Sequence, residues 1–168
     1  MDQDSRGRGF ARRLPSLGPR GEGWVALQGV LIVAALVAGV KGARWSRATT
    51  RPRLAAALPL AALGAGLFAA GARGLGGQIT PFPRPHAAGA LRREGAYALV
   101  RHPIYGGVLL LAWAWALLTS PAALVPALLG IPFLEAKRHR EEAWLAEQHS
   151  DYEDYQRQVP RRFIPFVW

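Results

Sequence analysis

Residues 104–134 read IYGGVLLLAWAWALLTSPAALVPALLGIPFL, a run of 31 residues without one charged side chain. The run is too long for a single membrane-crossing helix, because about 20 residues are enough to cross a hydrocarbon layer of about 30 Å. Ser120 and Pro121 divide it into two halves, and proline disfavours an unbroken helix at that point. We therefore predict a tight helical hairpin over this run.

Two further uncharged runs come before the hairpin and predict helices over 24–42 and 54–72. Each is long enough to cross a membrane, and Pro59 in the second can be tolerated in such a helix. After the hairpin, residues 133–158 favour an amphipathic helix. The predicted fold is all-α: an integral membrane bundle of about four transmembrane helices with a cytoplasmic C-terminal amphipathic helix.

The length of 168 residues suits one domain. Residues 1–23 are rich in Gly, Arg and Pro and are expected to form a disordered basic arm. Residues 24–168 then form the membrane domain, and the chemically informative motifs lie within 78–165. The segment 78–103 contains several Pro and Gly residues that discourage regular structure.

The net charge of +10 comes from Arg and Lys that lie between the apolar runs. Basic flanks around apolar spans favour anionic lipid headgroups, so we expect the lipid bilayer as a partner and no nucleic acid. The arm, segment 78–103 and the C-terminal tail carry most of these residues. The distribution predicts a multi-pass protein of a bacterial inner membrane with these segments facing the cytoplasm.

Several kinds of site are excluded by composition and spacing. The chain has no cysteine, which rules out disulfides and thiolate chemistry. His102 and His139 do not have the spacing of zinc ligands, so no metal site is expected. No glycine-rich loop matches a phosphate-binding motif, and no nucleophile elbow is present.

A first cluster of chemically capable residues, GAYALVRHPIYGG at 95–107, lies at the start of the hairpin. Pro103 suits the first turn of a helix. Free backbone amides there, with two phenols, a guanidinium and an imidazole, would suit a polar ligand that bears a carboxylate. The alternative is structural: Arg101 extends to lipid phosphates, and the tyrosines belong to an interfacial aromatic belt.

A second cluster, KRHREEAWL at 137–145, follows the hairpin. Because a hairpin returns the chain to the same membrane face, we expect this cluster to lie near Arg101. Its carboxylates could then hold an ammonium group or ribose hydroxyls of a ligand. The alternative is a solvated helix face on which Arg138 and Glu142, four residues apart, form a weak ion pair.

The order of these clusters, followed by Tyr152-x-x-Tyr155 and Val159-Pro160, resembles the isoprenylcysteine carboxyl methyltransferase family. Phospholipid N-methyltransferases share much of the pattern. The resemblance covers roughly 78–165 and implies an integral membrane methyltransferase. It would use S-adenosyl-L-methionine as cofactor and methylate a lipid-like or prenylated acceptor.

The resemblance also implies roles for individual residues. The implied cofactor-binding residues are Leu91, Tyr97, Arg101, His102, Pro103, Ile104, Tyr105, Glu141 and Glu142. Glu141 and His102 would be the catalytic residues, needed most where an amine must lose a proton. Lys137 and Arg138 would approach the substrate, whereas His149 lies outside both motifs and is expected to take no part.

Three functions remain open at this point. Carboxyl O-methylation is favoured by the C-terminal pattern, and phospholipid N-methylation is the alternative within the same class. A non-catalytic membrane protein that keeps the fold is the alternative from another class. In the catalytic reading, Glu142→Gln is expected to weaken cofactor binding about ten- to a hundredfold.

Overall fold

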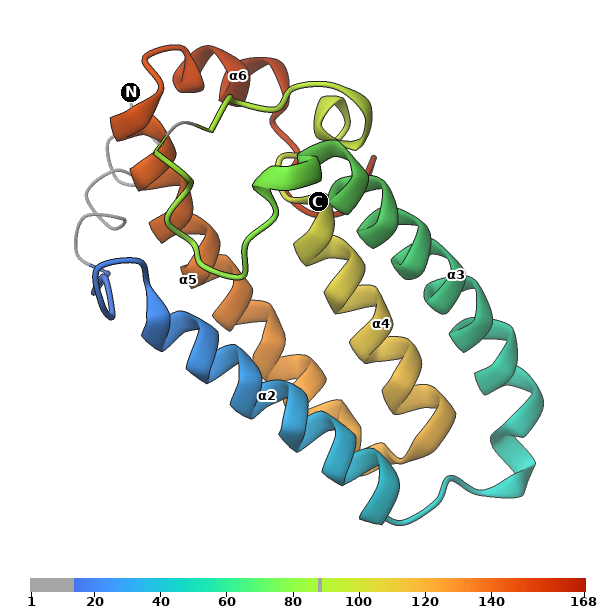
Figure 1. Ribbon diagram of the computed structural model, residues 1–168. Helices are drawn as coiled ribbons and strands as arrows, with labels where there is room; N and C mark the ends of the chain where they lie inside the picture. Colours follow the sequence, from blue (N-terminus) through green and yellow to red (C-terminus); the bar gives the residue numbers. More distant parts are fainter. Residues whose placement is uncertain (1–13, 88) are drawn as a thin grey trace, which may run out of the picture.

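The structure is a computed structural model that describes residues 14–87 and 89–168, and in these ranges it contains helices and no strand (Figure 1). The first 13 residues of the predicted arm lie outside the described residues. The α-helices are α2 (Glu22–Lys41), α3 (Thr50–Leu75), α4 (Pro103–Thr119), α5 (Leu124–Gln148) and α6 (Tyr152–Gln158). The all-α prediction is confirmed for the described part of the chain.

The predicted hairpin is confirmed as helices α4 and α5. Helix α4 ends at Thr119, and the 3-10 turn Pro121–Ala123 leads into α5. The buried Ser120 hydroxyl accepts a hydrogen bond from the Ala122 amide (3.2 Å) and donates one to the Ala43 carbonyl (2.8 Å). The turn is therefore fixed to the connection that follows α2.

Helices α3 and α4 make the most extensive contact in the bundle. Glycines permit it: a Cβ on Gly107 would lie 2.7 Å from the Phe68 amide nitrogen, and one on Gly71 would lie 2.9 Å from the Pro103 ring. Small residues let two helix backbones approach closely. This contact holds the beginning of α4, which carries the first cluster, against the end of α3.

Within residues 14–87 and 89–168, two helices are long and apolar enough to cross a membrane: α2, and α3 with its flanking turns over Arg47–Gln78. Only 11% and 17% of their most apolar windows are buried inside the protein. Helix α4 is shorter, with 17 residues. Of the predicted set of about four transmembrane helices, two therefore have the length and composition to cross a membrane.

Helices α2 and α4 begin, and α3 and α5 end, at the same end of the bundle (Figure 1). The predicted single helix over 133–158 is not what the structure contains. Helix α5 continues from the apolar hairpin through Gln148, and α6 is a separate helix. The segment 78–103 is irregular as predicted, apart from short 3-10 turns such as Gly95–Ala98.

Candidate functional site

A buried carboxylate, that of Glu142, lies where α4, α5 and α6 meet. Its Oε1 accepts hydrogen bonds from Arg101 Nε and His102 Nε2, both at 2.9 Å. Its Oε2 accepts from Arg138 Nη1 at 2.6 Å and from Gln156 Nε2 at 3.0 Å. We call these five residues the carboxylate hub.

The hub is held together by charge in a buried place. Burial opposes ionisation of Glu142, but the hydrogen bond from His102 and the charges of Arg138 and Arg101 outweigh it. Together they hold the pKa of Glu142 well below the ordinary carboxyl range. A carboxylate has about four acceptor positions, and the protein's own donors occupy them. Glu142 therefore has no position left for a ligand.

The hub also fastens the C-terminal tail. Arg101 Nη1 donates to the carbonyls of Val159 (2.7 Å) and Pro160 (3.0 Å). The backbone amides of Arg101 and His102 donate to the carbonyls of residues 161 and 162, at 3.1 and 2.8 Å. The Val-Pro pair that follows α6 is thus a docking segment for the start of α4.

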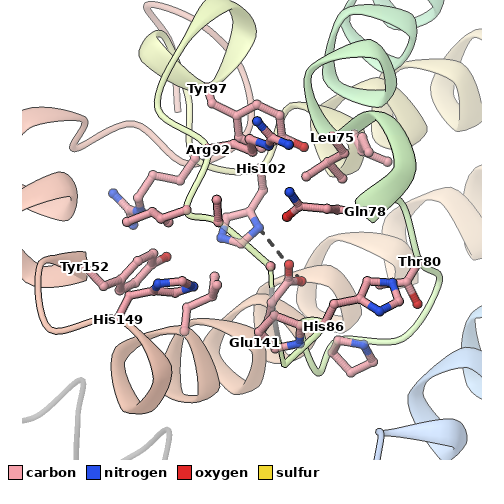
Figure 2. Close-up of a pocket in the computed structure, with 18 of the residues that line it drawn as sticks. Leu75, Gln78, Thr80, His86, Arg92, Tyr97, His102, Glu141, His149 and Tyr152 are labelled. Atoms are coloured by element: carbon pink, nitrogen blue, oxygen red, sulfur yellow. Dashed lines mark ion pairs between the residues drawn. The ribbon is translucent and has the colours of Figure 1, made fainter.

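A cavity of about 880 Å³, counting its open mouth, lies beside the hub (Figure 2). Its walls come from the irregular segment before α4, from the polar half of α5 and from α6. Seven of the predicted site residues line it: Leu91, Tyr97, Arg101, His102, Ile104, Tyr105 and Glu141. Four of the predicted site residues are not among its lining residues: Pro103, Lys137, Arg138 and Glu142.

The Glu141 carboxylate, unlike that of Glu142, lines the cavity. Its side chain is 25% exposed, and its Oε2 accepts a hydrogen bond from the Tyr105 hydroxyl. The His102 ring stacks on the Tyr105 ring, with centroids 5.3 Å apart and planes inclined by 11°. His102 Nδ1 lies 4.0 Å from Glu141 Oε2, and a dashed line marks this pair in Figure 2. His102 thus faces the hub with one ring nitrogen and the cavity with the other.

Lys137 is only 1% exposed and lies between three elements. Its Nζ donates to Gln28 Oε1 (2.6 Å) on α2 and to the Pro81 carbonyl (3.0 Å), and it lies 5.3 Å from the Tyr105 ring centroid. Burial lowers its pKa, although the charge of Glu141 opposes the shift. Lys137 therefore connects α5 to α2 and to the irregular segment through hydrogen bonds.

Several cavity residues were missed by sequence reasoning: Gln78, Thr80, His86, Arg92, His149 and Tyr152. His149, which we expected to take no part in cofactor binding, also lines the cavity (Figure 2). Most of these residues come from irregular segments, where no periodicity indicates which side chains point inward. Tyr152 did carry a signal, the Tyr-x-x-Tyr spacing, but the sequence assigned it no contact.

No family model matches the chain, and no solved structure gives a significant match. Two curated proteins do. The chain is 35% identical over 76 residues to a Delta(14)-sterol reductase of Dictyostelium discoideum, covering 43% of this chain and 16% of that protein. It is 34% identical over 79 residues to the Delta(14)-sterol reductase TM7SF2 of Mus musculus, covering 45% and 19%. The chain therefore spans less than a fifth of the length of these relatives, which are enzymes.

These matches overturn the methyltransferase interpretation. The relatives are sterol reductases, so membership of the isoprenylcysteine carboxyl methyltransferase family, methyl transfer to a lipid or prenylated acceptor, and S-adenosyl-L-methionine as cofactor are all wrong. Phospholipid N-methylation fails on the same ground. The hub gives the physical reason why the motif misled us. Several of the residues that suggested methyl transfer bind one another and hold the helices together. A scaffold of this kind can support different chemistries.

Proposed function

We propose that this chain forms the reductant-binding part of a membrane sterol-modifying reductase. The observation that carries the proposal is the cavity with the Tyr105–Glu141 pair on its wall, at the end of the bundle where α3 and α5 end. The likeness to two Delta(14)-sterol reductases supports the reaction class. The reaction would saturate a carbon–carbon double bond of a sterol-like lipid.

Such a reduction adds a hydride to one carbon and a proton to the other, so the site needs a hydride donor and an acid. A reduced nicotinamide dinucleotide supplies the hydride in many enzymes. The residues that line the cavity offer groups suited to a molecule of that kind. Tyr97 and Tyr152 offer aromatic walls, and Arg92 offers a cation for phosphate.

The proton would come from the Tyr105–Glu141 pair. The Tyr105 hydroxyl donates to Glu141, so the pair holds a proton at the cavity wall. His102 stacks on Tyr105 and is anchored to the hub through its other nitrogen, which fixes the orientation of the pair. We propose Tyr105 and Glu141 as catalytic residues and His102 as the residue that positions them.

The proposal includes a membrane arrangement. Helix α4 and the apolar half of α5 would lie in the bilayer beside α2 and α3, so that residues 24–168 form one membrane domain. The cavity would face the cytoplasm, where reduced dinucleotides are available. A lipid substrate would then approach from the bilayer and the reductant from water.

A deuterium-transfer experiment tests the reaction. Protein in lipid nanodiscs is incubated with a Δ14-unsaturated sterol and NADPH deuterated at nicotinamide C4. Two samples are prepared, each with the deuterium on one face of the nicotinamide ring. We expect a product with one deuterium from one of the two samples, detected by mass spectrometry. Glu141→Gln should reduce the yield, while Glu147→Gln, exposed on the same helix, should not. Absence of deuterated product from the wild-type protein in both samples contradicts the proposed reaction.

A further inference from the structure

Two tyrosines on α6, Tyr152 and Tyr155, are both buried, but their hydroxyl groups differ in hydrogen bonding. Their side chains are 1% and 2% exposed, and their rings pack against each other with centroids 5.9 Å apart. The Tyr155 hydroxyl donates a hydrogen bond to the Tyr97 carbonyl at 2.7 Å. The Tyr152 hydroxyl is buried and has no hydrogen-bond partner in the described part of the chain.

A buried hydroxyl without a partner is unfavourable, and most buried polar groups in folded proteins are paired. Tyr152 lines the cavity, and Figure 2 shows its side chain directed from α6 toward the cavity interior. The position of the hydroxyl therefore suggests that its partner is a molecule bound in the cavity.

The surroundings indicate the kind of partner. Burial, together with the charge of Glu142, raises the pKa of Tyr152 well above its ordinary value, with Arg101 acting in the opposite direction. The hydroxyl therefore keeps its proton and can donate. Charges of both signs act on the hydroxyl, those of Glu142 and Glu141 in one direction and that of Arg101 in the other, so the place has no excess of positive charge for a phosphate. A neutral oxygen acceptor suits this place better.

We propose that Tyr152 is a ligand-binding residue whose hydroxyl donates a hydrogen bond to a neutral oxygen of the bound reduced dinucleotide, either in the ribose or in the nicotinamide carboxamide. This inference rests on the proposed function. It adds a residue that neither sequence motif identified as a contact, and it gives the unpaired hydroxyl a role.

The experiment compares Tyr152→Phe with Tyr155→Phe in the detergent-solubilised protein. NADPH affinity is measured by calorimetry, and thermal unfolding is measured without ligand. We expect Tyr152→Phe to weaken NADPH binding about two- to tenfold and to leave the unfolding temperature unchanged or higher, because no internal hydrogen bond is lost. Tyr155→Phe should lower the unfolding temperature, because it loses its bond to the Tyr97 carbonyl.

A failure of the Tyr152 inference can be distinguished from a failure of the proposed function. Unchanged NADPH affinity in Tyr152→Phe, with normal binding by the wild-type protein, overturns this inference and leaves the proposed function intact. A lower unfolding temperature in Tyr152→Phe also overturns it, because the hydroxyl would then have an internal role. Absence of NADPH binding by the wild-type protein overturns the proposed function and this inference with it.

A thionicotinamide analogue of NADPH, in which sulfur replaces the carboxamide oxygen, separates the two acceptors. If Tyr152 donates to the ribose, the loss of affinity in Tyr152→Phe persists with the analogue. If it donates to the carboxamide, the difference between wild type and variant becomes small. Either result supports the proposed contact and locates it.

Discussion

The carboxylate hub and the cavity beside it use adjacent glutamates for different purposes. Glu142 accepts hydrogen bonds from four side chains and is 7% exposed. Glu141 accepts one from Tyr105, and its side chain is 25% exposed. Successive residues on a helix point about 100° apart, so one carboxylate enters the protein interior while the next faces the cavity. The comparison shows that a Glu-Glu pair is not one functional unit.

The largest effect that we predict is on the stability of the hub. Glu142→Gln removes the charge that compensates two buried arginines, Arg101 and Arg138. Breaking a buried charge network in this way should lower the free energy of unfolding by about 3–5 kcal/mol. Denaturation of the detergent-solubilised protein measures the change. Glu147→Gln, exposed on the same helix, should stay within about 0.5 kcal/mol of wild type. Equal stability of the two variants would show that the hub does not stabilise the folded protein.

A second variant disturbs the hub from the tail side. A Cβ on Gly106 would lie 2.0 Å from the Phe163 carbonyl oxygen, a backbone atom that cannot move without displacing the tail. Gly106→Ala should therefore cost about 1–3 kcal/mol of stability. Gly66 on α3 has nothing within 4 Å of such a Cβ, and Gly66→Ala should leave stability unchanged or raise it. If both alanine variants melt alike, the tail does not dock closely on α4.

The hub should also make stability depend on pH. The pKa of Glu142 is lower in the folded protein than its ordinary value of 4.5, so the unfolded chain binds more protons below that pH. The contribution of Glu142 is therefore fully present above about pH 4.5 and is lost as the pH falls further. Unfolding curves between pH 3 and 7 should show the gap between wild type and Glu142→Gln narrowing below about pH 4.5. A gap that stays constant over this range contradicts the assignment.

The smallest stability effect is expected at Glu141. Glu141→Gln keeps an oxygen that can accept from Tyr105, and the side chain is partly exposed, so we expect a change of about 0.5 kcal/mol or less. Its effect should appear instead in ligand binding and turnover. Thermal unfolding of Glu141→Gln, measured alongside Glu142→Gln, tests whether Glu142 is structural and Glu141 is not. A loss at Glu141 as large as that at Glu142 would show that both glutamates are structural.

The helices and their meeting at one end could be predicted because long uncharged runs constrain a chain strongly. Ser120-Pro121 divides the longest run, and the hairpin that follows brings Arg101 near Glu142 as expected. The sequence predicted one helix over 133–158 after the hairpin, whereas its first part is continuous with the hairpin as α5, which ends at Gln148, and its last part is the separate helix α6.

The site could be predicted only in part. Tyr105 and Glu141 lie in regular elements next to recognisable motifs, and both line the cavity. His149 and Tyr152 follow the end of α5, and their direction depends on how the irregular chain packs. The reaction class could not be read from the motif, because Arg101, His102 and Glu142 mainly bind one another. Residues that satisfy one another specify a scaffold and leave the cofactor unspecified.

We propose that the cavity, on its Glu141 side, holds a reduced dinucleotide. Calorimetric titration of the wild-type protein in nanodiscs with NADPH tests it most directly, with Glu141→Gln as the variant and S-adenosyl-L-methionine as the comparison ligand. We predict saturable NADPH binding that is weaker in Glu141→Gln, and no saturable binding of S-adenosyl-L-methionine. Saturable binding of S-adenosyl-L-methionine without any binding of NADPH would contradict the claim.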